Sequence, residues 1–313
     1  MAVTGTVRVS SLPPNGISAI AAHLQSQHGA QPAGSWRIRF RPHRRSPGTP
    51  GVAEGALPRR TLWEVTDAAH PQHVFLVWED AGQPTRAEMA RTGTHASSSR
   101  WHARVMSAEF STLLRLSNLP GPLGSPAGTP GPGAWVPRGA QVLLEGLSFH
   151  IRLRGLQART GGALGVVGEQ DECVFSIGNV VVGSDRIVGG MIEIQYLPLT
   201  QLPADSSLLG SLLLALLPPD ILPLLAPVAG PLSLSLPTVV PRTMLPPALL
   251  AEVVPASTAA WQQGPTIGVA GAPGFAPWDA DEAAPDALGW TSLEARRRMA
   301  YVHLTLLRAE GLA

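Results

Sequence analysis

Residues 172–182 read ECVFSIGNVVV and residues 191–197 read MIEIQYL, and these two stretches decide the fold. In both, apolar side chains recur at every second position, which is typical of a strand with one buried face. The apolar faces hold Phe175 and Ile177 in the first stretch and Ile192, Ile194 and Tyr196 in the second, opposite Glu193 and Gln195. The pairs Gly178-Asn179 and Gly189-Gly190 predict bulges or turns in this part of the sheet.

Alternation of the same kind continues on the N-terminal side of these stretches. Further strands are predicted over Val3–Val9, Trp36–Arg41, Thr61–Thr66, His73–Glu79 and Gln141–Leu156. The last of these places its apolar residues on one face, namely Leu147, Phe149, Ile151 and Leu153. The run Val74–Trp78 is apolar on both faces, as expected of a strand in a covered sheet or a barrel.

Helices are predicted between and after the strands. Apolar residues at helical spacing indicate helices over Ile17–Gln27, Ser107–Leu116 and Leu208–Leu217, and a capping box at residues 291–294 begins a helix that runs through Arg308. The expected core residues are Ile17, Ile20, Ala21 and Leu24, then Phe110, Leu113 and Leu114, and finally Met299, Val302, Leu306 and Ala309. Consecutive strands with inserted helices favour an α+β fold, an antiparallel sheet or barrel with flanking helices.

Glycine and proline are unusually frequent, with 33 and 31 of the 313 residues. Loops rich in them are expected over residues 42–58 and 118–133. Residues 218–288 are expected to form a Pro-rich flexible insertion between a domain at 1–217 and a C-terminal helix at 289–313 that packs back on that domain. The uncharged run at 221–241 has the length of a membrane span, but its recurring prolines argue against a spanning helix.

Charge and cysteine content narrow the functional classes. All 23 basic residues are arginines and the formal net charge is +1, so chemistry that needs a lysine is excluded and no global field favours nucleic acid or an acidic membrane. The single cysteine, Cys173, excludes intrachain disulfides and cysteine-based zinc sites, and a reducing compartment is expected. Residues 1–5 lack a charged segment followed by an apolar run, so no signal peptide is expected there.

A search for catalytic motifs identifies none. His70 and His73 are interpreted as turn histidines rather than metal ligands. The run Gly161–Gly165 lacks the spacing of a dinucleotide-binding loop, and neither a P-loop nor a Gly-x-Ser-x-Gly elbow occurs. The acidic cluster at residues 279–282 is interpreted as solvated. We therefore predict no catalytic, cofactor-binding or metal-binding residue.

The main electrostatic feature is a strip of arginines at Arg37–Arg45. It consists of Arg37, Arg39, Arg41, Arg44 and Arg45, interleaved with Trp36 and Phe40. Two interpretations stay open: a phosphate-binding face, or the solvent side of an edge strand whose apolar residues point inward. Arg296–Arg298, in the last helix, is interpreted as a solvated face.

Four segments together resemble one known family. Residues 3–5 lead into a strand and an amphipathic helix, and Val74–Glu79 is a central apolar strand. Phe175–Gly183 and Gly190–Leu199 match a "hydrophobic-x-hydrophobic-Gly-Asn-Val" strand and its "Gly-hydrophobic-x-hydrophobic-Glu-Tyr" partner, with Gln195 where an acidic residue is common. Together with the C-terminal helix, these segments resemble subunit 20 of Mediator, the RNA polymerase II coactivator, in its fungal form. The likeness covers roughly residues 1–217 and 290–313.

The resemblance implies a non-enzymatic, nuclear subunit of the Mediator head, built on a strongly twisted antiparallel β-barrel. In that family the subunit pairs with the related barrel of subunit 18, and the C-terminal helix of subunit 8 tethers the pair to the rest of the head. Contacts with the TATA-binding protein and RNA polymerase II are implied as well. No cofactor, membrane association or sequence-specific contact with nucleic acid is implied.

Two other functions compete with this one. An RNA- or phosphate-binding module would use the Arg37–Arg45 strip and bind in a salt-sensitive manner. A tunnel-type triphosphatase would line its barrel with Glu-x-Glu strands, lysine and arginine to hold metal and triphosphate. The nearest strand reads Ile192-Glu193-Ile194-Gln195, which is one carboxylate short. The residues expected in the interior are apolar: Phe149, Ile151, Phe175 and Ile177.

Overall fold

The computed structural model describes residues 3–9, 11–45, 60–93, 100–116, 134–153, 172–197, 208–222 and 292–313. The strands are β1 (Val3–Val9), β2 (Gln31–Arg45), β3 (Arg60–Asp67), β4 (His73–Asp80), β5 (Trp101–Ser107), β6 (Trp135–Pro137), β7 (Val142–Arg152), β8 (Glu172–Val182) and β9 (Arg186–Tyr196). The helices are α1 (Gly16–His28), α2 (Arg86–Thr92), α3 (Phe110–Leu116), α4 (Leu208–Leu216) and α8 (Ser292–Ala309). The expected loop at 118–133, the glycines at 161–165, the acidic cluster at 279–282, Thr291 and most of the 218–288 insertion lie outside the described residues.

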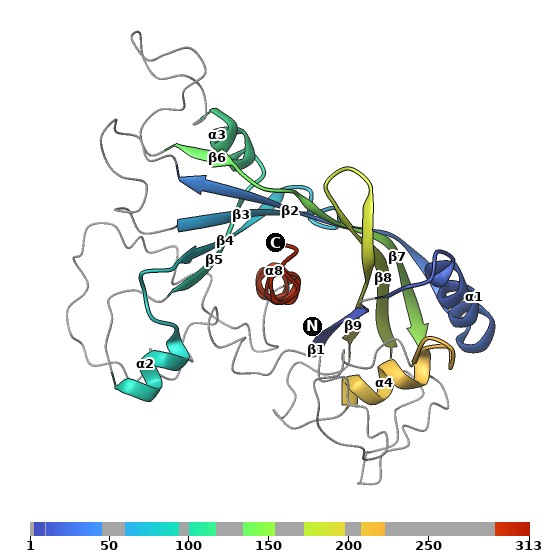
Figure 1. Ribbon diagram of the computed structural model, residues 1–313. Helices are drawn as coiled ribbons and strands as arrows, with labels where there is room; N and C mark the ends of the chain where they lie inside the picture. Colours follow the sequence, from blue (N-terminus) through green and yellow to red (C-terminus); the bar gives the residue numbers. More distant parts are fainter. Residues whose placement is uncertain are drawn as a thin grey trace.

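The strands form one antiparallel sheet in the order β1-β9-β8-β7-β2-β3-β4-β5, with β6 beside the outer half of β2. The predicted α+β fold with an antiparallel sheet is therefore confirmed. Among the described residues, β1 and β5 end the sheet and do not pair with each other, so the sheet is open and a barrel is not confirmed. The sheet curls around α8, which lies inside the curve (Figure 1).

Helices cover both faces of this curved sheet. We call the face toward α8 the concave face and the opposite face, outside which α1, α3 and α4 lie, the convex face (Figure 1). The concave core includes Trp36, Ile38, Phe40, Phe75, Val77, Tyr301 and Leu304. The convex core beneath α1 and α4 includes Ile20, Leu24, Phe149, Ile151, Phe175, Ile177, Ile194 and Leu212. The apolar residues expected in a barrel interior therefore pack on the outside of the curve.

Two facing glycines divide the concave core from the convex core. Gly146 on β7 pairs with Gly178 on β8, and a Cβ at Gly146 would lie 1.9 Å from the backbone oxygen of Ile177. Only glycine permits so close an approach of two strands. Before the pair, β7 buries Val142 and Leu144 in the concave core, and beyond it Phe149 and Ile151 in the convex core. Leu147, which alternation places in the core, lies at this change of face and is 42% exposed.

The other predicted strands and helices are present, with several corrections. β2 continues through residues 42–45, where a loop is expected, because this half pairs with β3 and β6. β5, β6 and α2 are not among the predicted elements, although Thr85 and Glu88 form a capping box at the start of α2. In α3 only Leu114 is fully buried and Leu113 is 57% exposed, contrary to the expected apolar stripe.

The described convex core continues past Leu217, because Ile221 is 4% exposed and belongs to it. The predicted apolar helix, α4, is confirmed: it buries most of its leucines against β9, which explains a helix without charged residues. Gly311, just beyond the end of α8, adopts the left-handed conformation expected of a stop, with a φ of 70°. None of the described helices combines the length and apolar character that a membrane crossing needs.

Candidate functional site

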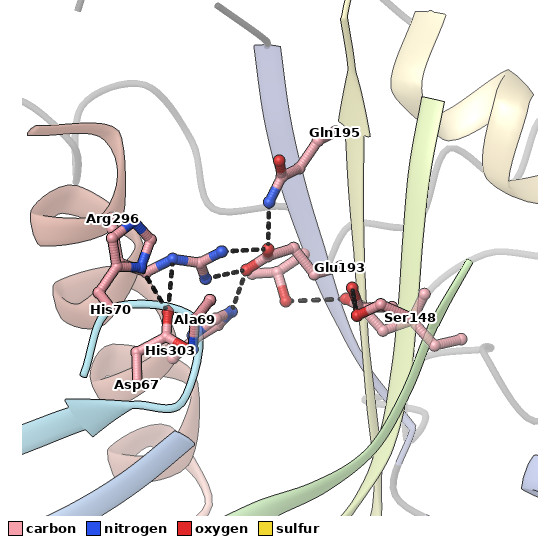
Figure 2. Close-up of polar contacts among 11 residues, drawn as sticks. Asp67, Ala69, His70, Ser148, Glu193, Gln195, Arg296 and His303 are labelled. Atoms are coloured by element: carbon pink, nitrogen blue, oxygen red, sulfur yellow. Dashed lines mark hydrogen bonds and ion pairs between the residues drawn. The ribbon is translucent and has the colours of Figure 1, made fainter. Parts of the chain in front are cut away.

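A buried polar cluster joins α8 to two distant strands of the sheet (Figure 2). Asp67 is the last residue of β3, Glu193 and Gln195 lie on β9, and Arg296 and His303 lie on α8. We call these five residues the clamp. Alternation along β9 directs Ile192 and Ile194 to the convex core and therefore Glu193 to the concave face.

The Arg296 guanidinium holds both carboxylates of the clamp. Its Nη1 and Nη2 donate to the two oxygens of Glu193 at 3.0 and 3.1 Å, and its Nε lies 2.9 Å from Asp67 Oδ2. Gln195 Nε2 donates to Glu193 Oε1 at 2.7 Å, and His303 Nε2 lies 3.1 Å from Oε2. Both Glu193 oxygens are thus engaged by side chains of the chain itself, as Figure 2 shows.

Charge pairing outweighs burial in the clamp. Burial alone would raise the pKa of Glu193, but Arg296 and His303 hold that pKa well below its ordinary value. Burial likewise opposes the charge on Asp67, and contacts with His70 and Arg296 lower its pKa. Burial would lower the pKa of Arg296, yet Glu193 and Asp67 raise it. The three groups are therefore charged at neutral pH and depend on one another.

Further contacts attach α8 to β4 and β5. Arg297 Nη1 donates to the backbone oxygen of Ala103 on β5 at 2.7 Å. Arg308 Nη1 lies 2.9 Å from Glu79 Oε2 at the end of β4, and its guanidinium lies over the Trp101 ring at 4.9 Å. One edge of the open sheet is thus tied to the helix through charged groups.

The opposite edge is attached near the end of the helix. Arg8 on β1 is buried, and its Nη2 lies 3.0 Å from Glu310 Oε2, just beyond α8. Arg8 also donates to the backbone oxygens of Val188 and Gly190, both at 2.6 Å. Since α8 contacts both β1 and β5, it links the two edges of the sheet that do not pair with each other.

The clamp overturns one interpretation made from the sequence. Arg296 and Arg297 are 9% and 8% exposed, so the expectation of a solvated face at Arg296–Arg298 is wrong for them. Ala309, expected in the core, is exposed. The run at 299–307, MAYVHLTLL, carries apolar residues on every side of a helix, and such a helix is enclosed. Arginines on an enclosed helix need carboxylate partners. The apolar run that follows Arg296–Arg298 in the sequence therefore indicated that these arginines are paired rather than solvated.

The ion pairs of the clamp attach α8 to β3 and β9. Within the described part of the chain, no group of three or more His, Cys, Asp or Glu residues is arranged to hold a metal ion. His70 lies in the turn between β3 and β4, as expected, with its Nδ1 3.4 Å from Asp67 Oδ2, and His73 is the first residue of β4. Cys173 is buried in the convex core, and burial raises the pKa of its thiol to about 12.

The Arg37–Arg45 strip lies on a central strand rather than an edge. β2 pairs with β7 on one side and β3 on the other, so the interpretation as an edge strand is wrong. The inward direction of Trp36, Ile38 and Phe40 is confirmed. Arg37, Arg39 and Arg41 consequently lie on the convex face.

Comparison with known proteins adds no relative to this description. No protein-family model matches the chain, and no curated protein matches it.

Proposed function

We propose that this chain is a non-enzymatic interaction subunit of the Mediator head, of the subunit 20 type, acting in the nucleus. In this proposal it pairs with the related barrel of subunit 18 and is tethered through the C-terminal helix of subunit 8. The assembled head relays regulatory signals to RNA polymerase II and the basal machinery, including the TATA-binding protein. The subunit contributes surfaces and rigidity rather than a reaction, and uses no cofactor.

One observation carries the proposal: the segments that resemble the family are neighbours in space. β1 pairs with β9, and β9 pairs with β8, so three of the resembling strands are consecutive in the sheet. α8 packs against β1 and against β4, the apolar strand of the resemblance. Segments far apart in the sequence thus form one unit, as expected if they were retained together as a scaffold.

The clamp and the neighbouring contacts of α8 would keep the curvature of this scaffold fixed. An open sheet has two free edges and can change its curvature, whereas a helix tied to both edges fixes that curvature. Arg296 ties α8 to β3 and β9, Arg297 ties it to β5, and Arg8 ties β1 to Glu310. A partner then meets a preformed surface, which reduces the ordering cost of association.

Co-expression with subunits 18 and 8 of the same organism tests the proposal. We expect a complex of the three chains that survives size-exclusion chromatography, and a higher soluble yield than for this chain alone. Affinity purification of the tagged chain from nuclear extract, followed by mass spectrometry, should enrich Mediator head subunits over an unrelated bait of similar size. A monodisperse chain that ignores both subunits, and an extract without enriched Mediator subunits, would refute the assignment.

A further inference from the structure

We propose that the convex face of β2, together with α3, is a docking surface for an acidic segment of a partner protein. The surface, called here the arginine face, consists of Arg37, Arg39, Arg41 and Arg115 with the flanking Leu113 and Leu116. The proposal concerns a surface that the clamp does not use, and it holds whether or not the chain belongs to Mediator.

The strand geometry gathers these cations on one face. Arg37, Arg39 and Arg41 occupy every second position of β2, so their side chains share a face at intervals of about 6.5 Å. Arg115 on α3 acts on the middle one: burial, with the charges of Arg41, Arg37 and Arg115, lowers the pKa of Arg39 although Glu64 opposes the shift. A lowered arginine pKa indicates a partly buried cation among other cations.

The central cation of the arginine face lacks a counter-ion within the described residues. Arg39 lies opposite Leu143 on β7 and Thr66 on β3, and it has no hydrogen bond or ion pair with any described residue. Arg37 lies 3.8 Å from Glu145, with side chains that are 59% and 56% exposed. Such loose, exposed pairing contributes little and leaves the guanidinium available.

Arg41 is also incompletely paired. Its guanidinium lies 3.9 Å from Glu64, and that carboxylate is already 3.1 Å from His43 Nε2. A carboxylate arriving from a partner would give Arg39 the ion pair that no described residue provides, held by two parallel hydrogen bonds, for which the guanidinium is shaped. Charge complementarity therefore points to an anionic occupant.

The surroundings favour a protein segment over a nucleic acid. Trp36 and Phe40, which would stack on bases, are 5% and 0% exposed in the concave core, on the other side of the sheet. Leu113 and Leu116, on either side of Arg115, are 57% and 53% exposed and offer contacts to apolar side chains. Carboxylates interspersed with apolar residues match this surface.

Fluorescence anisotropy with the full chain tests the proposal. The probe is a fluorescein-labelled peptide that repeats Asp-Glu-Leu, the control peptide repeats Asn-Gln-Leu, and a third probe is labelled oligouridylate RNA. We expect the acidic peptide to bind, with affinity that falls as salt rises, and the other two probes to bind at least tenfold more weakly. Equal binding of the neutral peptide, or tighter binding of the RNA, would overturn the proposal.

Matched variants locate the binding. Arg39→Gln should weaken the acidic peptide about tenfold, and Arg39→Gln combined with Arg115→Gln should abolish measurable binding. Arg152→Gln is the control, because Arg152 is exposed and carries the same charge. It is the last residue of β7, whereas Arg39 pairs with Leu143 near the first. Circular dichroism establishes that each variant is folded. Unchanged binding by folded Arg39→Gln, or equal loss with Arg152→Gln, would overturn the assignment of this face.

Discussion

Arginines on the two faces of the sheet have opposite surroundings. On the concave face Arg296, Arg308 and Arg8 each have a nitrogen within 3.0 Å of a carboxylate oxygen. On the convex face Arg37 and Arg41 are 3.8 and 3.9 Å from theirs. Desolvation explains the clearest cases: the Arg296 and Arg8 side chains are 10% and 3% exposed and must be paired, whereas that of Arg37 is 59% exposed and keeps its water. The same residue type thus holds a helix on one face and remains available on the other.

Removing the central cation of the clamp should have the largest effect on stability. Arg296→Met leaves Glu193 and Asp67 buried without a cation, and breaking a buried pair in this way costs about 3–5 kcal/mol. Urea unfolding followed by circular dichroism at neutral pH measures the loss.

Arg152→Met is the matched control for that experiment. The side chains of Arg152 and Glu172 are 70% and 42% exposed, and an exposed pair contributes about 0–1 kcal/mol. If the two variants lose similar amounts of free energy, the clamp does not stabilise α8 in the sheet and the contrast between the faces is wrong.

Acid should weaken the clamp by the next largest amount. The pKa values of Glu193 and Asp67 are lower in the folded chain than in the unfolded one, so the unfolded chain binds more protons as the pH falls. Their contribution is complete above the unfolded values of about 4 and is lost as the pH falls toward the folded values. Unfolding free energy measured between pH 7 and pH 3 should therefore decrease, and less steeply in Arg296→Met. Equal slopes for the two proteins would exclude these carboxylates as the cause.

Much of the sheet could be predicted because alternation reports burial locally. Ile192, Ile194 and Tyr196 share a buried face as expected, and so do Phe175 and Ile177. β5 was not predicted because it is an edge strand that buries little surface. Of its residues only Ala103 is fully buried, so apolar and polar residues need not alternate along it. Alternation of apolar residues thus predicts the strands that other elements cover and misses an edge strand such as β5.

Curvature could not be predicted, because it depends on contacts between distant residues. β7 keeps its alternation through the Gly146–Gly178 pair, but its concave side is covered before the pair and its convex side beyond it, and nothing in the sequence states that these glycines face each other. Arg296 is buried because its helix lies inside the curve, and its partners are residues 67 and 193. The candidate site thus depends on long-range topology that a strand pattern does not contain.

Gln195 provides a smaller test of the clamp. Strand alternation alone makes Gln195→Glu nearly neutral, but its amide donates to Glu193 Oε1 at 2.7 Å. A carboxylate at 195 would replace this donor by a like charge, and we expect a loss of about 1–2 kcal/mol at neutral pH. Gln195→Met, which removes the donor without adding charge, is the control and should lose less. Urea unfolding that ranks the two variants in reverse order would show that repulsion from Glu193 is unimportant.

The smallest effect is expected on the convex face, where Arg39→Gln should change the free energy of unfolding by no more than about 0.5 kcal/mol. Arg39 has no described partner to lose, and the neighbouring charges of Arg37, Arg41 and Arg115 act against it. Its removal therefore relieves repulsion, and any change should be toward greater stability, more visibly at low salt. Thermal melts of Arg39→Gln and the wild type at low and high salt measure this directly. A loss as large as that expected for Gln195→Glu would mean that Arg39 stabilises the sheet, which would leave it unavailable to a partner and remove the distinction between the two faces.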